Sequence, residues 1–238
     1  MKLPLYFGFF EKDFSSSYPS GLPIAAMGGH FAPDGGLILP KGGEILVVDD
    51  RVLPAASAEP ARAALNRAAE GYSGILFDFE RPRNGFCTAL LTEFVPPAGC
   101  FTIVPPAYAA LCPSALVLAS GVLCNNWFAF CQKNQARWPN RWCMELRPWD
   151  EQTARSGPEA RLFHRQALCQ IVSHDGRYRV FDTEQTISRK LLAAEAQGCQ
   201  LAVGLYQELK ALLPPPGKKS QNMPPEDEKI LAIGEEIW

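Results

Sequence analysis

The sequence carries two carboxylates, Asp78 and Glu80, at the end of an apolar run over residues 74–80. The run predicts a β-strand whose side chains alternate between two faces, so Asp78, Glu80 and Leu76 share one face. Proton donation near neutral pH needs a carboxyl group with a raised pKa, and burial beside a second carboxylate raises it. The free-energy cost of burying two carboxylates is lowest at the C-terminal mouth of a β/α barrel, where the active sites of barrel enzymes lie. The pair is our first candidate for catalysis.

A structural role for the same two residues is the alternative. Arg81 and Arg83 follow the predicted strand directly. Their guanidinium groups would neutralise Asp78 and Glu80 as ion pairs. The pair would then be a salt-bridged strand end in an α/β protein of unrelated function.

The segment from Ser73 to Glu80 resembles the catalytic strand of glycoside hydrolase family 18, the chitinase-like barrels, whose pattern is D-G-x-D-x-D-x-E. Gly74, Asp78 and Glu80 match the glycine, the last aspartate and the glutamate of that pattern. The resemblance implies substrate-assisted, retaining hydrolysis of a glycan that contains N-acetylglucosamine, of the chitin or peptidoglycan type. Glu80 would be the general acid, and Asp78 would hold the acetamide group of the substrate. The resemblance implies no metal and no organic cofactor.

Two aspartates of the family pattern are replaced in this chain, by Ser73 and Leu76. Leu76 matters more, because it faces inward directly below Asp78, where the family has a buried carboxyl group that shares a proton with that aspartate. The replacement predicts catalysis that is slow, altered or lost. The alternative function is therefore a catalytically inactive barrel that binds glycans, a pseudoenzyme or lectin.

A second resemblance lies near the other end of the chain. Residues 178–182, 186–190 and 198–209 look like the closing βα unit of the spore-associated and cell-wall-associated bacterial members of the same family. We expect residues 201–209 to form the last strand, with Tyr206 on the same face as Gly204. Tyr206 would then form an aromatic floor, where the family uses a tryptophan against the sugar, or it would simply fill the barrel.

Apolar runs and turn residues predict strands that alternate with helices. We expect strands at residues 3–10, 44–49, 74–80, 101–104 and 115–119, and helices at residues 58–70, 88–94 and 126–135. Residues 11–43 are expected to be loop with some extended pieces. The pair Asp175 and Gly176 joins residues 166–173 and 177–182 into a hairpin. Asp182 and Gln185 resemble a capping box for a helix that ends at Gly198.

This alternation indicates an α/β protein with a mostly parallel sheet. The glycine-rich phosphate turn of open doubly wound sheets is missing, so we predict a (β/α)8 TIM-like barrel. Roughly 210 residues are available against about 250 for a full barrel, so we expect one or two helices to be replaced by loops. An extra β-hairpin precedes the last βα unit. Residues 1–212 would form this single domain, and residues 213–238 a tail rich in proline and charge.

Further candidates for substrate binding come from other predicted elements. Asp49 and Asp50 close a strand on the predicted face of the acidic pair, so one of them would bind a sugar hydroxyl or serve in a loop. Trp127 belongs to a group of four tryptophans interspersed with arginines, which would be a glycan-binding wall or part of the core. Tyr6, on the first predicted strand, is another candidate. The other three tryptophans are Trp138, Trp142 and Trp149.

Composition excludes several function classes. The formal net charge of −2 argues against nucleic acid as the main partner. The longest apolar stretch is interrupted by Asn125 and Asn126, so no membrane span is predicted. The eight cysteines form no C-x-x-C pair, and the three histidines show no ligand spacing, so no metal site is expected.

Buried, reduced thiols and the lack of a signal-peptide pattern favour an intracellular location, with spore or cell-wall association as the alternative. The oligomeric state is left open.

Overall fold

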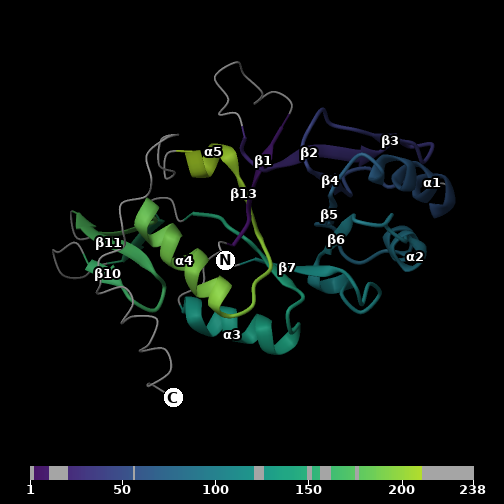
Figure 1. The fold of residues 1–238 in the computed structure, drawn as a ribbon. Helices are drawn as coiled ribbons and strands as arrows, with labels where there is room; N and C mark the ends of the chain where they lie inside the picture. The colour runs from purple at the N-terminus through teal and green to yellow at the C-terminus, as the bar shows by residue number, and fades with distance from the viewer. Residues whose placement is uncertain are drawn as a thin grey trace.

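Eight parallel strands form a closed ring (Figure 1). The structure is a computed structural model that describes residues 3–10, 21–55, 57–120, 126–148, 152–155, 162–174 and 177–210. In ring order the strands are β1 (Leu5–Phe9), β2 (Ile24–Phe31), β4 (Ile45–Asp49), β5 (Gly74–Asp78), β6 (Phe101–Val104), β7 (Leu116–Ser120), β8 (Trp142–Glu145) and β13 (Ala202–Leu205). The ring closes because β1 pairs with both β2 and β13. The predicted (β/α)8 TIM-like barrel is confirmed.

Among the described residues, helices connect only some of the ring strands, so the barrel is trimmed as predicted. Four helices lie between ring strands in these residues: α1 (Ala58–Ala69), α2 (Gly85–Glu93), α3 (Trp127–Arg137) and α4 (Glu184–Ala196). The connection from β2 to β4 instead contains β3 (Leu37–Ile38), which pairs antiparallel with β2 outside the ring. The connection from β6 to β7 contains the short 3-10 helix η2 (Pro106–Tyr108).

A second, antiparallel sheet is inserted between β8 and α4. Its strands are β9 (Gln152–Arg155), β10 (Leu162–His164), β11 (Cys169–His174) and β12 (Arg177–Phe181). The order is β10-β11-β12-β9, so the predicted hairpin forms the β11–β12 pair and the other two strands extend it. Figure 1 shows β10 and β11 beside α4, on the side of the molecule away from α1 and β3.

Side chains inside and outside the ring form separate cores. On the outside, Ile75 and Phe77 of β5 belong to one cluster with Leu65 of α1 and Leu90 of α2. Leu76 belongs to the interior cluster, so β5 alternates as predicted. The interior cluster consists of Ala25, Ile45, Val47, Leu76, Ile103, Cys143, Leu201 and Val203.

The start of α4 differs from the prediction. Thr183 and Thr186 form the capping box, in place of Asp182 and Gln185. Asp182 lies one residue before the cap and accepts hydrogen bonds from Thr186 Oγ1 at 2.9 Å and from Lys190 Nζ at 2.7 Å. Its carboxylate therefore ties the helix to the end of β12 through side chains instead of capping the backbone.

Residues 11–43 were expected to be largely loop, yet they contain β2, a full member of the ring. The richness of this stretch in serine, glycine and proline, including Gly28 and Gly29, led to the loop interpretation. Here the two glycines mark a bulge, because the register between β2 and β4 shifts between Ala26 and Gly29. A Cβ atom at Gly29 would lie 2.6 Å from the carbonyl oxygen of Val47, so glycine is required by the close approach of the two backbones.

The last ring strand is shorter than predicted. β13 ends at Leu205, and Tyr206–Leu209 forms the short helix α5. The partner strand β8 pairs with β13 only as far as Glu145 opposite Val203, so the ladder ends there and the chain turns back over β1. The prediction that Tyr206 continues the strand face of Gly204 is therefore wrong.

The tail at residues 213–238 and the domain boundary predicted at residue 212 lie outside the described residues. In the described ranges, no helix has the length and apolar character needed to cross a membrane. The seven cysteines in these ranges are free thiols, and all except Cys112 are buried.

Candidate active site

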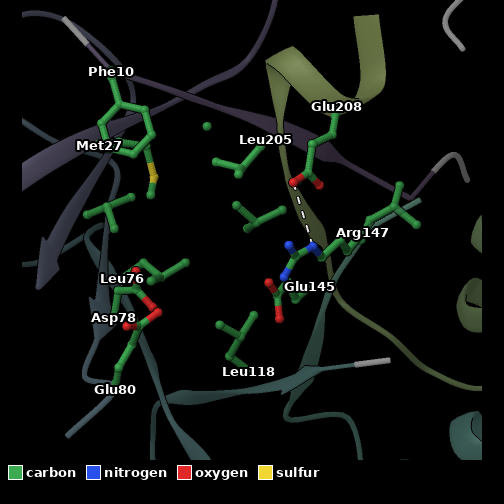
Figure 2. A pocket seen from close by; sticks show the side chains of 15 residues that line it. Phe10, Met27, Leu76, Asp78, Glu80, Leu118, Glu145, Arg147, Leu205 and Glu208 are labelled. Atoms are coloured by element: carbon green, nitrogen blue, oxygen red, sulfur yellow. Dashed lines mark ion pairs between the residues drawn. The ribbon is translucent and has the colours of Figure 1, made fainter. Parts of the chain in front are cut away.

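A pocket of about 430 Å³ opens at the C-terminal mouth of the barrel (Figure 2). Its walls come from seven of the eight ring strands and from segments that follow some of them. The lining residues are Gly8, Phe10, Met27, Val47, Leu76, Asp78, Glu80, Leu118, Glu145, Leu146, Arg147, Val203, Gly204, Leu205 and Glu208.

Asp78 and Glu80 both line this pocket, on the face that strand alternation predicts. Asp78 ends β5 and is partly buried, whereas Glu80 lies two residues farther along and is exposed. Leu76 lies one step deeper on the same face and is only 3% exposed. The acidic pair is therefore reachable from solvent and rests on an apolar floor.

The arginines after the strand do not neutralise the pair. Arg81 donates a hydrogen bond to the carbonyl oxygen of Arg51 at 2.6 Å, and Arg83 Nε donates to Thr88 Oγ1 at 3.4 Å. Among the described residues, no ion pair involves either carboxylate of the pair. The alternative of a salt-bridged strand end is not what the described residues form.

The pKa of Asp78 is raised to about 6, mainly by burial and then by the negative charges of Glu80, Glu145, Asp49 and Asp50, in that order. Desolvation disfavours the charged form, and each nearby carboxylate adds repulsion. Asp78 therefore gains its proton near pH 6 instead of near pH 4.

Two aspartates at the end of β4 hold the loops that follow β4 and β5. Asp50 is 3% exposed and accepts hydrogen bonds from the backbone nitrogens of Glu80 at 3.1 Å and Arg81 at 3.0 Å. Asp49 forms an ion pair with Arg51, whose Nε donates to it at 2.8 Å. Of the two roles considered for these aspartates, the structure shows the loop role, and neither residue is among those lining the pocket.

The opposite wall carries Glu145 and Glu208, which were not among the sequence candidates, and Arg147, which belongs to the arginines interspersed with the tryptophans. Glu145 ends β8 and Arg147 follows it, and Arg147 Nε lies 3.6 Å from the Glu208 carboxylate of α5. Figure 2 shows this wall across the pocket from Asp78 and Glu80. The available signal was the same one that identified the acidic pair, two charged residues at alternate positions after a short apolar run. That run, Trp142 to Met144, is only three residues long and begins with a tryptophan, so it was interpreted as part of an aromatic group.

The predicted aromatic contacts lie elsewhere. Trp127 is 3% exposed and donates its indole N–H to the carbonyl oxygen of Lys190 at 3.0 Å. Trp138 and Trp142 are 9% and 0% exposed, and Trp149 lies outside the described residues. The prediction of Trp127 as a substrate-binding residue is contradicted, because a buried indole cannot stack on a sugar. These three tryptophans belong to the core, which was the other interpretation.

The two predicted tyrosines do not line the pocket either. Tyr206 packs its ring on Phe9, with 4.3 Å between centroids, outside the barrel interior. Tyr6 packs against the interior cluster, and burial and the charge of Glu44 raise the pKa of its hydroxyl. Because Glu44 directly precedes β4, Tyr6 lies toward the end of the barrel opposite the pocket. The structure thus brings Asp78 and Glu80 together and separates them from Tyr6, Tyr206 and Trp127.

Within the described ranges, no group of three or more histidine, cysteine, aspartate or glutamate side chains is arranged to hold a metal ion.

The chain is similar to known proteins in its structure, whereas comparison of its sequence finds no match. No protein-family model matches the chain, and neither does any curated protein. The fold is similar to that of the spore cortex-lytic enzyme SleL of Bacillus cereus, with a TM-score of 0.59, 13% identity, and coverage of 98% of this chain and 75% of that one. It is also similar to a GH18 chitinase of Cycas revoluta in complex with (GlcNAc)3, with a TM-score of 0.60, 11% identity, and coverage of 97% and 99%. A class V chitinase of Nicotiana tobaccum in complex with NAG4 has a TM-score of 0.58, 9% identity, and coverage of 86% and 93%. The chain therefore has the barrel fold of the GH18 chitinases and of SleL.

Proposed function

We propose that this protein is a glycoside hydrolase of the family 18 type that cleaves a glycan containing N-acetylglucosamine. The observation that carries the proposal is that Asp78 and Glu80 line one open pocket at the C-terminal mouth of the barrel. Two of the neighbours in fold are chitinases in complex with N-acetylglucosamine oligosaccharides, and one is a spore cortex-lytic enzyme. These neighbours support a chitin-type or peptidoglycan-type glycan as the partner.

In the proposed reaction Glu80 is the general acid. Its carboxyl group donates a proton to the glycosidic oxygen as the bond from that oxygen to C1 of the sugar breaks. The acetamide carbonyl oxygen of the same sugar forms a new bond to C1, which gives a cyclic oxazolinium ion that becomes a neutral oxazoline when its N–H proton is taken up. A water molecule then attacks C1, gives its proton back to Glu80 and leaves the configuration at C1 retained. The exposure of Glu80 on the pocket side suits contact with a leaving sugar and then with water.

Asp78 acts on the acetamide group in this proposal. Its carboxylate accepts the acetamide N–H, orients the carbonyl oxygen toward C1 and takes up the proton as positive charge develops. The proton returns to the nitrogen when the ring opens. A carboxylate with a pKa of about 6 is a better acceptor for this proton than an ordinary aspartate, because the difference in acidity between donor and acceptor is smaller.

One observation favours the second candidate, a glycan-binding barrel without catalysis. Leu76 is buried directly beneath Asp78, at the position of the family's proton-sharing carboxyl group. An apolar side chain there cannot accept or return a proton. The two candidates share the pocket and differ only in whether a glycosidic bond is cleaved.

Turnover of fluorogenic N-acetylglucosamine oligomers separates the candidates. We expect the parent protein to release the fluorophore and Glu80→Gln to lose at least about 100-fold in rate. The matched control is Glu93→Gln, which removes a carboxylate from the exposed end of α2, far from the pocket. Equal release by the parent and Glu80→Gln would exclude hydrolysis at this site. Saturable binding of the same oligomers without release would then support the glycan-binding barrel.

A further inference from the structure

A third carboxylate, Glu145, faces the acidic pair from across the pocket. It ends β8, and β6 and β7 separate that strand from β5 in the ring. Figure 2 shows Asp78 and Glu80 on one side of the pocket and Glu145 on the other. The three carboxylates therefore share one volume, although they are brought together from sequence positions 67 residues apart at their widest (145 − 78).

The charges around Asp78 differ in how far they are already compensated. Asp49 is paired with Arg51, and Asp50 accepts two backbone N–H groups. Glu208 is paired with Arg147 on the far wall, with 3.6 Å between Arg147 Nε and the Glu208 carboxylate. Glu80 must carry a proton when it acts as the acid. Within the described part of the chain, no hydrogen bond or ion pair involves the Glu145 carboxylate, so it is the uncompensated charge facing Asp78 in the reactive state.

The space between the two carboxylates is lined by apolar side chains. Leu76 lies beneath Asp78, and Leu118 of β7 lies between β5 and β8 on the same pocket. Apolar surroundings screen charges less than water does, so the field of Glu145 reaches Asp78 with more strength than at an open surface. In agreement, Glu145 is one of the groups that raise the pKa of Asp78.

We propose that Glu145 is a positioning residue of this site, which acts through Asp78: its charge across the pocket keeps the Asp78 carboxylate basic enough to take the acetamide N–H proton. The inference rests on the proposed function and deepens it. Leu76, which lies beneath Asp78, has no charge and cannot influence the proton on Asp78. The inference assigns that influence to Glu145 on β8. As the ring closes, the N–H proton moves to Asp78 and leaves a neutral oxazoline, and it returns to nitrogen on hydrolysis, so no other proton donor or acceptor is needed.

Direct titration of Asp78 tests the inference without relying on turnover. The carboxyl carbon of Asp78, assigned by comparison with Asp78→Asn, is followed by NMR between pH 3 and 9 in the parent, Glu145→Gln and Glu208→Gln proteins. We expect the midpoint of Asp78 to fall by about 0.5–1 pH unit in Glu145→Gln. Glu208→Gln removes the same charge from the same pocket and should produce a clearly smaller shift.

Kinetics supply the second readout. The acid limb of the profile of kcat/KM against pH should move downward in Glu145→Gln by the same amount as the Asp78 midpoint, with kcat falling about tenfold while KM changes little. Glu145→Asp keeps the charge and should restore most of the midpoint and of kcat. An unmoved Asp78 midpoint in Glu145→Gln, or an equal shift in Glu208→Gln, would overturn the inference. Absence of turnover in the parent protein would overturn the proposed function, and this result comes from a separate measurement.

Discussion

The side chain of Asp50 holds the backbone of Glu80, with 3.1 Å between Asp50 Oδ1 and Glu80 N. The second oxygen accepts the backbone N–H of Arg81 at 3.0 Å. Asp50 directly follows β4, and Glu80 lies just past the end of β5, so the two hydrogen bonds lock adjacent strand ends together. Buried acceptors of this kind fix where the chain leaves a strand, and here they direct the Glu80 side chain into the pocket.

Replacing Asp50 should therefore affect both stability and the site. Asp50→Ala leaves two backbone N–H groups without their acceptor, and we expect a loss of about 2–3 kcal/mol in the free energy of unfolding. Asp50→Asn keeps one acceptor oxygen and should lose roughly half as much. Denaturant unfolding followed by tryptophan fluorescence measures both. Equal stability of the parent and Asp50→Ala would show that these hydrogen bonds contribute nothing net.

The position of the acidic pair was predictable because it depends on local sequence. Alternation along β5 places Leu76, Asp78 and Glu80 on one face, and the rule that barrel sites lie at the C-terminal mouth places them in the pocket. The contacts of the pair were only partly predictable. Asp50 was expected near the pair but not as an acceptor for the backbone of Glu80, and Glu145 was not expected there, because which strands meet depends on ring order and register.

Two errors in the elements have a common physical cause. The glycines of β2 were interpreted as loop residues because a single chain does not show that Gly29 must make room for the backbone of Val47. Likewise, the apolar alternation of residues 201–209 continues past Leu205, although the ladder with β8 has ended. In both cases a neighbouring strand, not the local pattern, decides the conformation.

Asp78 should destabilise the folded protein above pH 6. Its folded pKa of about 6 lies above its ordinary value of 3.8, so the stabilising contribution is fully present below about pH 4 and is lost as the pH rises through 6. We expect Asp78→Asn to be more stable than the parent by about 1–2 kcal/mol at pH 8, a figure reduced from the full linkage value for solvent screening. The difference should shrink toward pH 4. Thermal unfolding across this pH range checks the sign, and a constant difference would contradict the raised pKa.

Gly204 and Gly8 both line the pocket but should respond differently to an added methyl group. A Cβ at Gly204 would lie 2.5 Å from the backbone carbonyl oxygen of Leu146, which cannot move without shifting a strand end. A Cβ at Gly8 would meet side-chain atoms of Leu205 at 3.2 Å and Met27 at 3.3 Å, which can yield. We expect Gly204→Ala to lose about 1–3 kcal/mol of stability and Gly8→Ala less than about 1 kcal/mol. Chemical denaturation of the two variants makes the comparison, and the reverse ranking would refute it.

Lys190 and Asp182 form a buried ion pair at 2.7 Å, with side chains 3% and 0% exposed. Removing one partner leaves a buried charge, so Asp182→Asn or Lys190→Met alone should lose about 3–5 kcal/mol of stability. The double variant Asp182→Asn/Lys190→Met should lose less than the sum of the single losses. A double-mutant cycle by urea unfolding gives the coupling energy, and strict additivity would show that the two charges do not interact.

Tyr206 should contribute to stability more than to sugar binding. Its ring stacks on Phe9, so Tyr206→Ala should lower the free energy of unfolding by about 2 kcal/mol or more, and Tyr206→Phe by much less. Affinity for N-acetylglucosamine oligomers, measured by titration calorimetry below the unfolding temperature, should be unchanged in Tyr206→Phe. A large loss of affinity in Tyr206→Phe with unchanged stability would show that Tyr206 contacts the substrate.

The pairing of β1 with β13 sets the order in which the molecule can be completed. Leu5 lies opposite Ala202, and Gly8 lies opposite Leu205. One edge of β1 therefore stays unpaired until β13 has been synthesised. At ordinary rates of translation this wait lasts on the order of tens of seconds, during which the nascent chain carries an unpaired edge that a chaperone must shield or that other chains can join. The barrel mouth is thus assembled only once β13 has left the ribosome.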